Sequence, residues 1–200
     1  MSNPAILRPQ VHRLAEACSD EREAFQSTAT RLIKQQRRLS RFIEQSFAGL
    51  NVDDQRKYVL SQMAVYMLSV SLRVFEQVGG RMRKVSTEDI NAATARIQGV
   101  TDELMPADGA FAARARAIEW RAQPHLLDEI LWALFDRPTS DPNEMDLPHD
   151  LSALVYMILW ASVEALDANW TPARSWSPEA GLLDGEDPTT WTPPEAAAAE

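Results

Sequence analysis

The sequence of 200 residues contains little cysteine, histidine or glycine. Its single cysteine, Cys18, rules out an internal disulfide and therefore a disulfide scaffold. Its three histidines (His12, His125 and His149) never recur at the helical spacing of a metal-binding His-x-x-x-His pair. No Gly-x-Ser-x-Gly elbow, phosphate loop or dinucleotide fingerprint occurs. The sequence therefore predicts no catalytic residues, no cofactor and no metal site.

Three groups come nearest to the carboxylate–histidine ligand set of a di-metal bundle. They are His12 with Glu16, His125 with Asp128 and Glu129, and Asp146 with His149. We interpret each as an incidental surface pair rather than a ligand set.

Long uninterrupted apolar runs are also missing. Residues 1–14 are broken by prolines and charged residues, so they do not have the continuous apolar stretch of a secretory signal. The longest uncharged runs, 58–72 and 151–163, fall short of the roughly 18 residues of a membrane span. These observations predict a cytoplasmic protein without a membrane segment.

What the sequence does contain is typical of a globular, all-α protein. Hydrophobic residues make up 45% and charged residues 24%, close to the average of globular chains. Strand signals are nearly absent, whereas helix start and stop residues recur. We expect a core domain over residues 1–170 that is a helical bundle of about six helices: 20–48, 52–78, 86–104, 108–121, 124–136 and 150–169.

Particular residues support these boundaries. Asp20 with Glu23 has the spacing of a capping box, as does Ser86 with Asp89, and Pro124 suits a first helical turn. The helices over 52–78 and 150–169 are apolar almost all the way round, unlike a surface helix. One of them would be the hub of the bundle. The other would either belong to that hub or form an oligomer interface.

The last segment, residues 171–200, differs in composition. It holds five of the twelve prolines and six acidic residues but a single basic residue, Arg174. We interpret it as an acidic C-terminal tail, either disordered or docked. Its large apolar residues favour docking, because an aromatic anchor with acidic flanks suits a basic receptor. The expected anchors are Trp176, Leu182, Leu183 and Trp191. The receptor could be a partner, another copy, or the chain's own basic helix face.

Charge is divided unevenly along the chain. Residues 1–125 carry 18 basic and 14 acidic side chains, whereas residues 126–200 carry 2 and 15, which gives balances of +4 and −13. One stretch of the first helix holds five cations uninterrupted by an acid, Arg31, Lys34, Arg37, Arg38 and Arg41. A second cluster follows at Arg81, Arg83 and Lys84. The first stripe is either a phosphate-binding face or a solvated face that the acidic half of the chain neutralises.

These features favour a non-enzymatic interaction or adaptor protein. In this hypothesis the acidic, tryptophan-bearing tail docks on a protein partner or another subunit. The alternative is a small helical subunit that binds nucleic acid through the Arg31–Arg41 face. A third hypothesis places a ligand site on the polar strip of the second helix, at Gln62, Ser69, Arg73 and Glu76.

Overall fold

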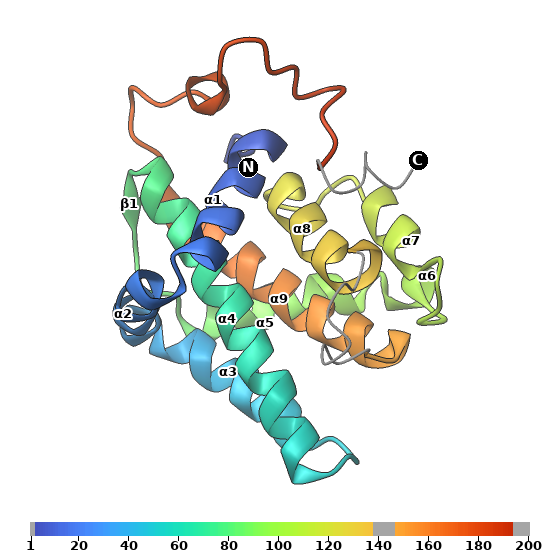
Figure 1. Cartoon of the computed structure of the whole chain (residues 1–200). Helices are drawn as coiled ribbons and strands as arrows, with labels where there is room; N and C mark the ends of the chain where they lie inside the picture. Colours follow the sequence, from blue (N-terminus) through green and yellow to red (C-terminus); the bar gives the residue numbers. More distant parts are fainter. Residues whose placement is uncertain (1–2, 138–146, 194–200) are drawn as a thin grey trace.

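The computed structural model describes residues 3–137 and 147–193, and these residues are mostly helical (Figure 1). The α-helices are α1 (Arg8–Asp20), α2 (Arg22–Gln35), α3 (Arg37–Ala48), α4 (Asp54–Val78), α5 (Thr87–Gln98), α6 (Thr101–Leu104), α7 (Phe111–Ala117), α8 (Pro124–Leu131) and α9 (His149–Asn169). The remaining elements are the π-helix η1 (Trp132–Asp136), the 3-10 helix η2 (Pro178–Gly181) and the strands β1 (Arg81–Met82) and β2 (Trp170–Thr171). The predicted all-α class is confirmed.

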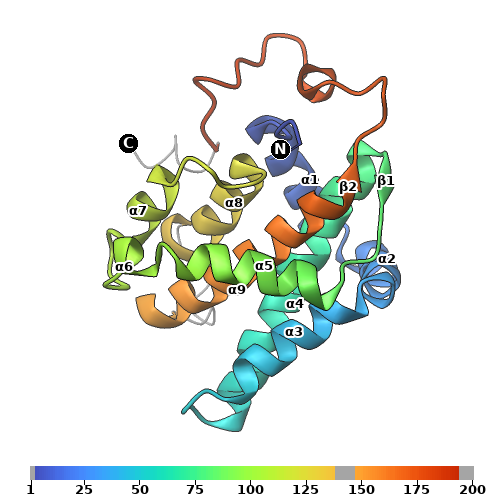
Figure 2. The same cartoon turned by 180° about the vertical axis from the view of Figure 1, so that it is seen from behind.

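Helix α9 is the hub. Its side chains are apolar almost all the way round, and Leu159, Trp160 and Val163 have no solvent exposure. It packs against α4, α5 and α8, and Figure 2 shows α5 lying along it. This arrangement settles which of the two all-apolar helices forms the centre of the fold.

Helix α4 is similarly apolar but much less covered. Asp53 caps its start by accepting a hydrogen bond from the Arg56 N–H at 2.8 Å, and Gly79 ends it with φ +87°. By length and composition, α4 and α9 could each cross a membrane, a property shared by buried core helices of globular proteins. The most apolar part of α9 is 83% buried, whereas that of α4 is 44% buried. One face of α4 therefore presents apolar side chains to the solvent.

The predicted helix over 20–48 is wrong at its start and in its middle. Residues 8–20 form α1, with Pro9 in the first turn, where its missing N–H costs nothing. Asp20 consequently ends α1 and caps no helix. The chain then breaks again at Gln36, which has φ −116° and ψ 47°, so α2 and α3 are separate helices.

Other predicted helices are also shorter than expected, so the described residues hold nine α-helices where about six were expected. The segment 86–104 divides at Gly99 into α5 and α6, although its Ser86–Asp89 capping box is confirmed. Helix α8 starts at Pro124 as predicted and continues into the π-helix η1. Residues 138–146, between η1 and α9, lie outside the described residues.

Candidate functional site

Gln36, at the break between α2 and α3, joins two basic clusters that are far apart in the sequence. Its side chain is 5% exposed. Its Nε2 donates to the carbonyl of Arg83 at 2.9 Å, and its Oε1 accepts from the N–H of Val85 at 2.9 Å. The segment that follows β1 is thereby held against the α2–α3 junction.

The resulting basic surface consists of eight exposed side chains: Arg31, Lys34, Arg37, Arg38, Arg41, Arg81, Arg83 and Lys84. The Arg31 guanidinium lies 2.6 Å from the carboxylate of Glu76, which belongs to the N-terminal half of the chain and not to its acidic C-terminal half. Arg38 donates to the Thr87 hydroxyl at 2.5 Å. The cations thus come from α2, α3 and the β1 segment, instead of from one continuous helix face as predicted.

An apolar groove between α2 and α4 borders this surface. It has a volume of about 350 Å³, and its walls include Ala29, Ile33, Lys34, Val65 and Tyr66. The ring of Tyr66, which is 40% exposed, meets the ring of Phe25 edge-on at 6.0 Å. Lys34 belongs to both the groove and the basic surface, so apolar and cationic side chains adjoin here.

The four residues of the polar strip predicted on α4 have two different surroundings. Gln62 and Ser69 line the α2–α4 groove, and the Ser69 hydroxyl donates to its own helix at the Val65 carbonyl, 2.7 Å away. Arg73 and Glu76 form an ion pair at 2.6 Å. Gln62 is exposed, whereas Ser69 is only 2% exposed. The members of the strip therefore differ in burial, and two of them reach the groove.

Comparisons with known proteins do not assign the chain to a family. No family model, curated protein or solved structure matches it. We therefore infer function from the geometry of the chain's own surfaces.

The described part of the tail lies on the chain's own surface, where Figure 1 shows it crossing α1 toward α8. The half-buried Trp176 packs against Trp170 with ring centres 5.4 Å apart, and Trp191 lies 5.1 Å from the His12 ring. Leu182 is half-buried and Leu183 is 59% exposed. The tail therefore contacts α1 of its own chain, a surface that was not among the three receptors considered.

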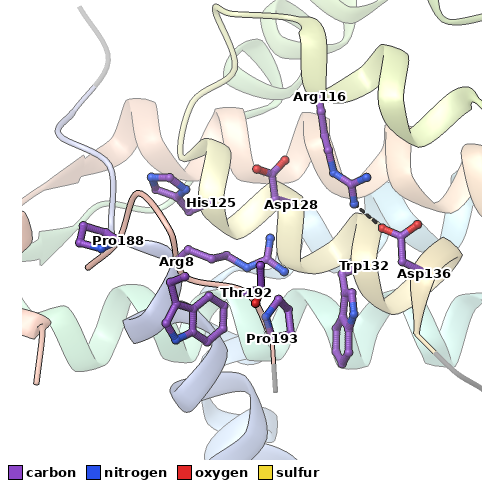
Figure 3. A pocket seen from close by; sticks show the side chains of 10 residues that line it. Arg8, Arg116, His125, Asp128, Trp132, Asp136, Pro188, Thr192 and Pro193 are labelled. Atoms are coloured by element: carbon purple, nitrogen blue, oxygen red, sulfur yellow. Dashed lines mark hydrogen bonds and ion pairs between the residues drawn. The ribbon is translucent and has the colours of Figure 1, made fainter. Parts of the chain in front are cut away.

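Beneath the tail is a polar pocket of about 380 Å³ between α1, α7 and α8 (Figure 3). Its charged side chains are paired. Arg116 lies 2.5 Å from Asp136, and Arg121, beside the pocket, lies 2.8 Å from Asp128. Arg8, from α1, lies 2.9 Å from Glu129. The pocket therefore presents balanced charge rather than a net cationic or anionic field.

His12 corrects the interpretation of the histidine–carboxylate pairs as surface pairs. It is 2% exposed, its Nδ1 lies 2.9 Å from Glu129 Oε1, and its Nε2 lies 3.4 Å from Glu16. The pair of His12 and Glu129 joins α1 to α8. Within 3–137 and 147–193, no group of three His, Cys, Asp or Glu side chains could hold a metal ion. The sequence missed the pair of His12 and Glu129 because Glu129 is distant in the chain and α1 itself was not predicted.

We expect the buried His12 and the half-buried His125 to titrate on opposite sides of pH 6.5. Burial lowers the pKa of His125. Burial also acts on the pKa of His12, but the hydrogen bond and charge of Glu129 outweigh it, so that pKa is raised above 6.5. A raised pKa contributes stability that is complete below pH 6.5 and is lost as the pH rises through the folded-state value.

The check is an NMR titration of the imidazole resonances, paired with urea unfolding between about pH 6 and 9. The His12→Gln variant should not show the part of the decline that His12 causes. A midpoint for His12 below that of His125 would contradict the assignment.

A buried polar row on α9 was missed by the sequence analysis. Glu164 accepts hydrogen bonds from the N–H of Ala122 at 2.7 Å and from the indole of Trp160 at 3.0 Å. One turn on, Asp167 accepts from the Gln123 amide at 2.8 Å. The presence of two carboxylates inside a largely apolar helix was the signal in the sequence that could have revealed this row. Their role here is structural, because they satisfy buried N–H groups of neighbouring segments.

Proposed function

We propose that this protein is a non-enzymatic interaction protein that docks an acidic segment of a protein partner. An apolar side chain of the segment would enter the α2–α4 groove, and its carboxylates would lie on the basic surface. The observation that carries the proposal is the position of Lys34, which lines the groove and also belongs to the basic surface. This keeps the expected class of function but moves the docking site away from the tail.

The apolar side of the site supports a protein partner. Buried apolar anchors supply most of the binding energy at protein interfaces, while surrounding charges govern association rate and specificity. The groove offers Ile33, Val65 and the half-exposed Tyr66 for such an anchor. A nucleic acid backbone would use the cations but would leave this apolar wall unused.

The solvent-facing side of α4 extends the apolar wall. Val59, Met63, Tyr66 and Val70 follow one another at spacings of four, three and four residues, as in the seam of paired helices. All four are half-buried or exposed. A helical partner segment that enters the groove would continue along this seam.

The cationic side supports an acidic partner. The basic surface has eight cations, and the carboxylates of Glu76, Glu88 and Asp89 nearby offset only part of their charge. Positive charge therefore prevails locally, although the whole chain carries −9. The positive potential would attract carboxylates from a distance and would weaken as salt is added.

The test measures binding of a fluorescent, leucine-containing, glutamate-rich helical peptide by anisotropy. We expect Lys34→Glu and Tyr66→Ser each to weaken binding by about tenfold or more, since one reverses an attraction and the other removes the apolar wall. Lys57→Glu is the matched control. By helical spacing Lys57 faces away from the Val59–Val70 seam, and its pairing with the exposed Asp54 at 3.6 Å is weak, so its reversal should change affinity less than about threefold.

A second titration uses a single-stranded RNA and a DNA duplex at about 50 mM salt. Nucleic acid binding that falls steeply with salt and is lost in Lys34→Glu, without peptide binding, would replace the proposal by its alternative. If neither probe binds, the groove and the basic surface are not a docking site.

A further inference from the structure

The C-terminal segment 181–193, here called the strap, is held on α1 by one arginine. The Arg13 guanidinium donates to the carbonyl of Gly181 at 2.5 Å and pairs with the carboxylate of Glu186. A side chain at Gly181 would collide with that of Gln10, so the strap approaches α1 closely at this point. Arg13 thus recognises a backbone carbonyl and an acidic side chain of the same segment.

A second anchor lies at the other end of the strap. Trp191 is half-buried and packs against His12, whose ring also meets Trp132 edge-on at 5.5 Å. Pro188 and Trp191 form part of the wall of the polar pocket between α1 and α8. The receiving surface therefore combines an arginine, an aromatic cluster and a shallow pocket.

The strap has a conformation of its own that suits this surface. Its Leu183 carbonyl accepts from the Glu186 N–H at 3.1 Å, and Gly185 between them has φ +87°, as a tight turn requires. Glu186 closes the turn by accepting from the Leu183 N–H at 2.8 Å. The same carboxylate faces Arg13, so the turn presents the charge that α1 recognises.

The connection between the strap and the core is exposed. After β2, most of the residues up to η2 are open to solvent, namely Ala173, Arg174, Ser175 and Ser177. The contacts with α1 described above are made by side chains and one carbonyl, without a β-ladder. The strap is therefore arranged as a tethered peptide on a receptor surface.

We infer that the α1–α8 surface is a binding site for an acidic, tryptophan-bearing peptide, and that the strap of a second copy binds there when the resident strap is released. The inference does not depend on the α2–α4 groove. A tethered segment has an effective concentration of about a millimolar, so the resident strap excludes a free one until its own contacts are weakened. Exchange between two copies then restores the same contacts in trans, which is the basis of domain swapping.

The test uses the full chain and a fluorescent peptide with the sequence of residues 181–193. In the released variant, Glu186→Arg with Trp191→Ser, both anchors of the resident strap are lost. We expect this variant to bind the peptide at least about tenfold more tightly than the unaltered protein does.

The matched control carries Asp187→Arg with Leu183→Ser. Asp187 accepts a hydrogen bond from Thr189 within the strap, and Leu183 is exposed, so this variant should behave like the unaltered protein. Equal peptide binding by the released variant and the control would overturn the inference, as would no binding at about 1 mM peptide.

A charge exchange separates recognition from loss of folding. For this test the resident strap carries Glu186→Ala with Trp191→Ser, so that it pairs with neither charge at position 13. Adding Arg13→Glu to that variant should abolish binding of the natural peptide. Binding should return with a peptide that carries Glu186→Arg, because the ion pair is then restored with reversed signs. Failure of the exchanged pair, in a variant whose circular dichroism is unchanged, would show that Arg13 does not recognise the strap.

Discussion

Replacing Trp160 with alanine is expected to lower the free energy of unfolding by about 3–5 kcal/mol. Trp160 is fully buried on α9, where its indole stacks on Trp120 at 5.2 Å and lies 5.7 Å from the Tyr156 ring. Alanine would leave a cavity in the hub and would remove one of the two hydrogen bonds that the Oε1 atom of Glu164 accepts. Urea denaturation followed by circular dichroism measures the loss.

The matched control is Trp176→Ala, which removes the same side chain from a half-buried position. It should cost clearly less, because less apolar surface returns to water. If the two variants were equally stable, α9 would not be the centre of the core.

Replacing Glu164 with alanine should cost about 2–4 kcal/mol. This carboxylate is buried and holds the Ala122 N–H, the Trp160 indole and the Arg96 guanidinium, the last at 2.9 Å. Arg96 is half exposed, so water screens its pairing. Most of the loss would come from the two buried N–H groups that no longer have an acceptor.

Glu164→Gln is the control for charge, because it keeps an acceptor oxygen at the same position and should cost less than the alanine variant. The double variant with Trp160→Ala should cost less than the sum of the single ones, since both remove the same hydrogen bond. Additive losses would show that the bond contributes little.

Local signals predicted the helices that are marked by their own residues. The Ser86 side chain caps α5 by accepting a hydrogen bond from the N–H of Asp89, three positions on, and Gly79 ends α4 without reference to the rest of the fold. The apolar pattern of α9 likewise predicted its burial. Each of these features is decided within one or two helical turns, so a sequence can show it.

Features that depend on distant partners were not predicted. The break at Gln36 is stabilised by hydrogen bonds to residues 83–85, and His12 is bonded to Glu129. Nothing near either residue in the sequence shows the partner. Pro9 was considered only as an interruption of an apolar stretch, and its place in the first turn of α1, which proline favours, was not predicted.

The candidate sites follow the same division. The sequence identified the cations of α2 and α3 and the tryptophans of the tail as chemically distinct, because composition alone shows them. It did not show that Arg83 lies beside the α2–α3 junction, or that Trp191 meets α1 instead of the basic stripe. Both outcomes depend on how helices pack, which charge and periodicity do not specify.

The central position of α9 has a consequence for how the chain is made. Chains are synthesised from the N-terminus at about 5–20 residues per second, so the 148 residues that precede α9 here take about 7–30 s to make before that helix begins to appear. Asn3, the first residue that the structure describes, donates its amide to the Asp167 carbonyl at 2.8 Å, near the end of that helix. The helix at the centre of the fold is therefore one of the last elements to be made. Until α9 is complete, the growing chain carries the apolar faces of the earlier helices without the element that covers them, which is the situation in which molecular chaperones act.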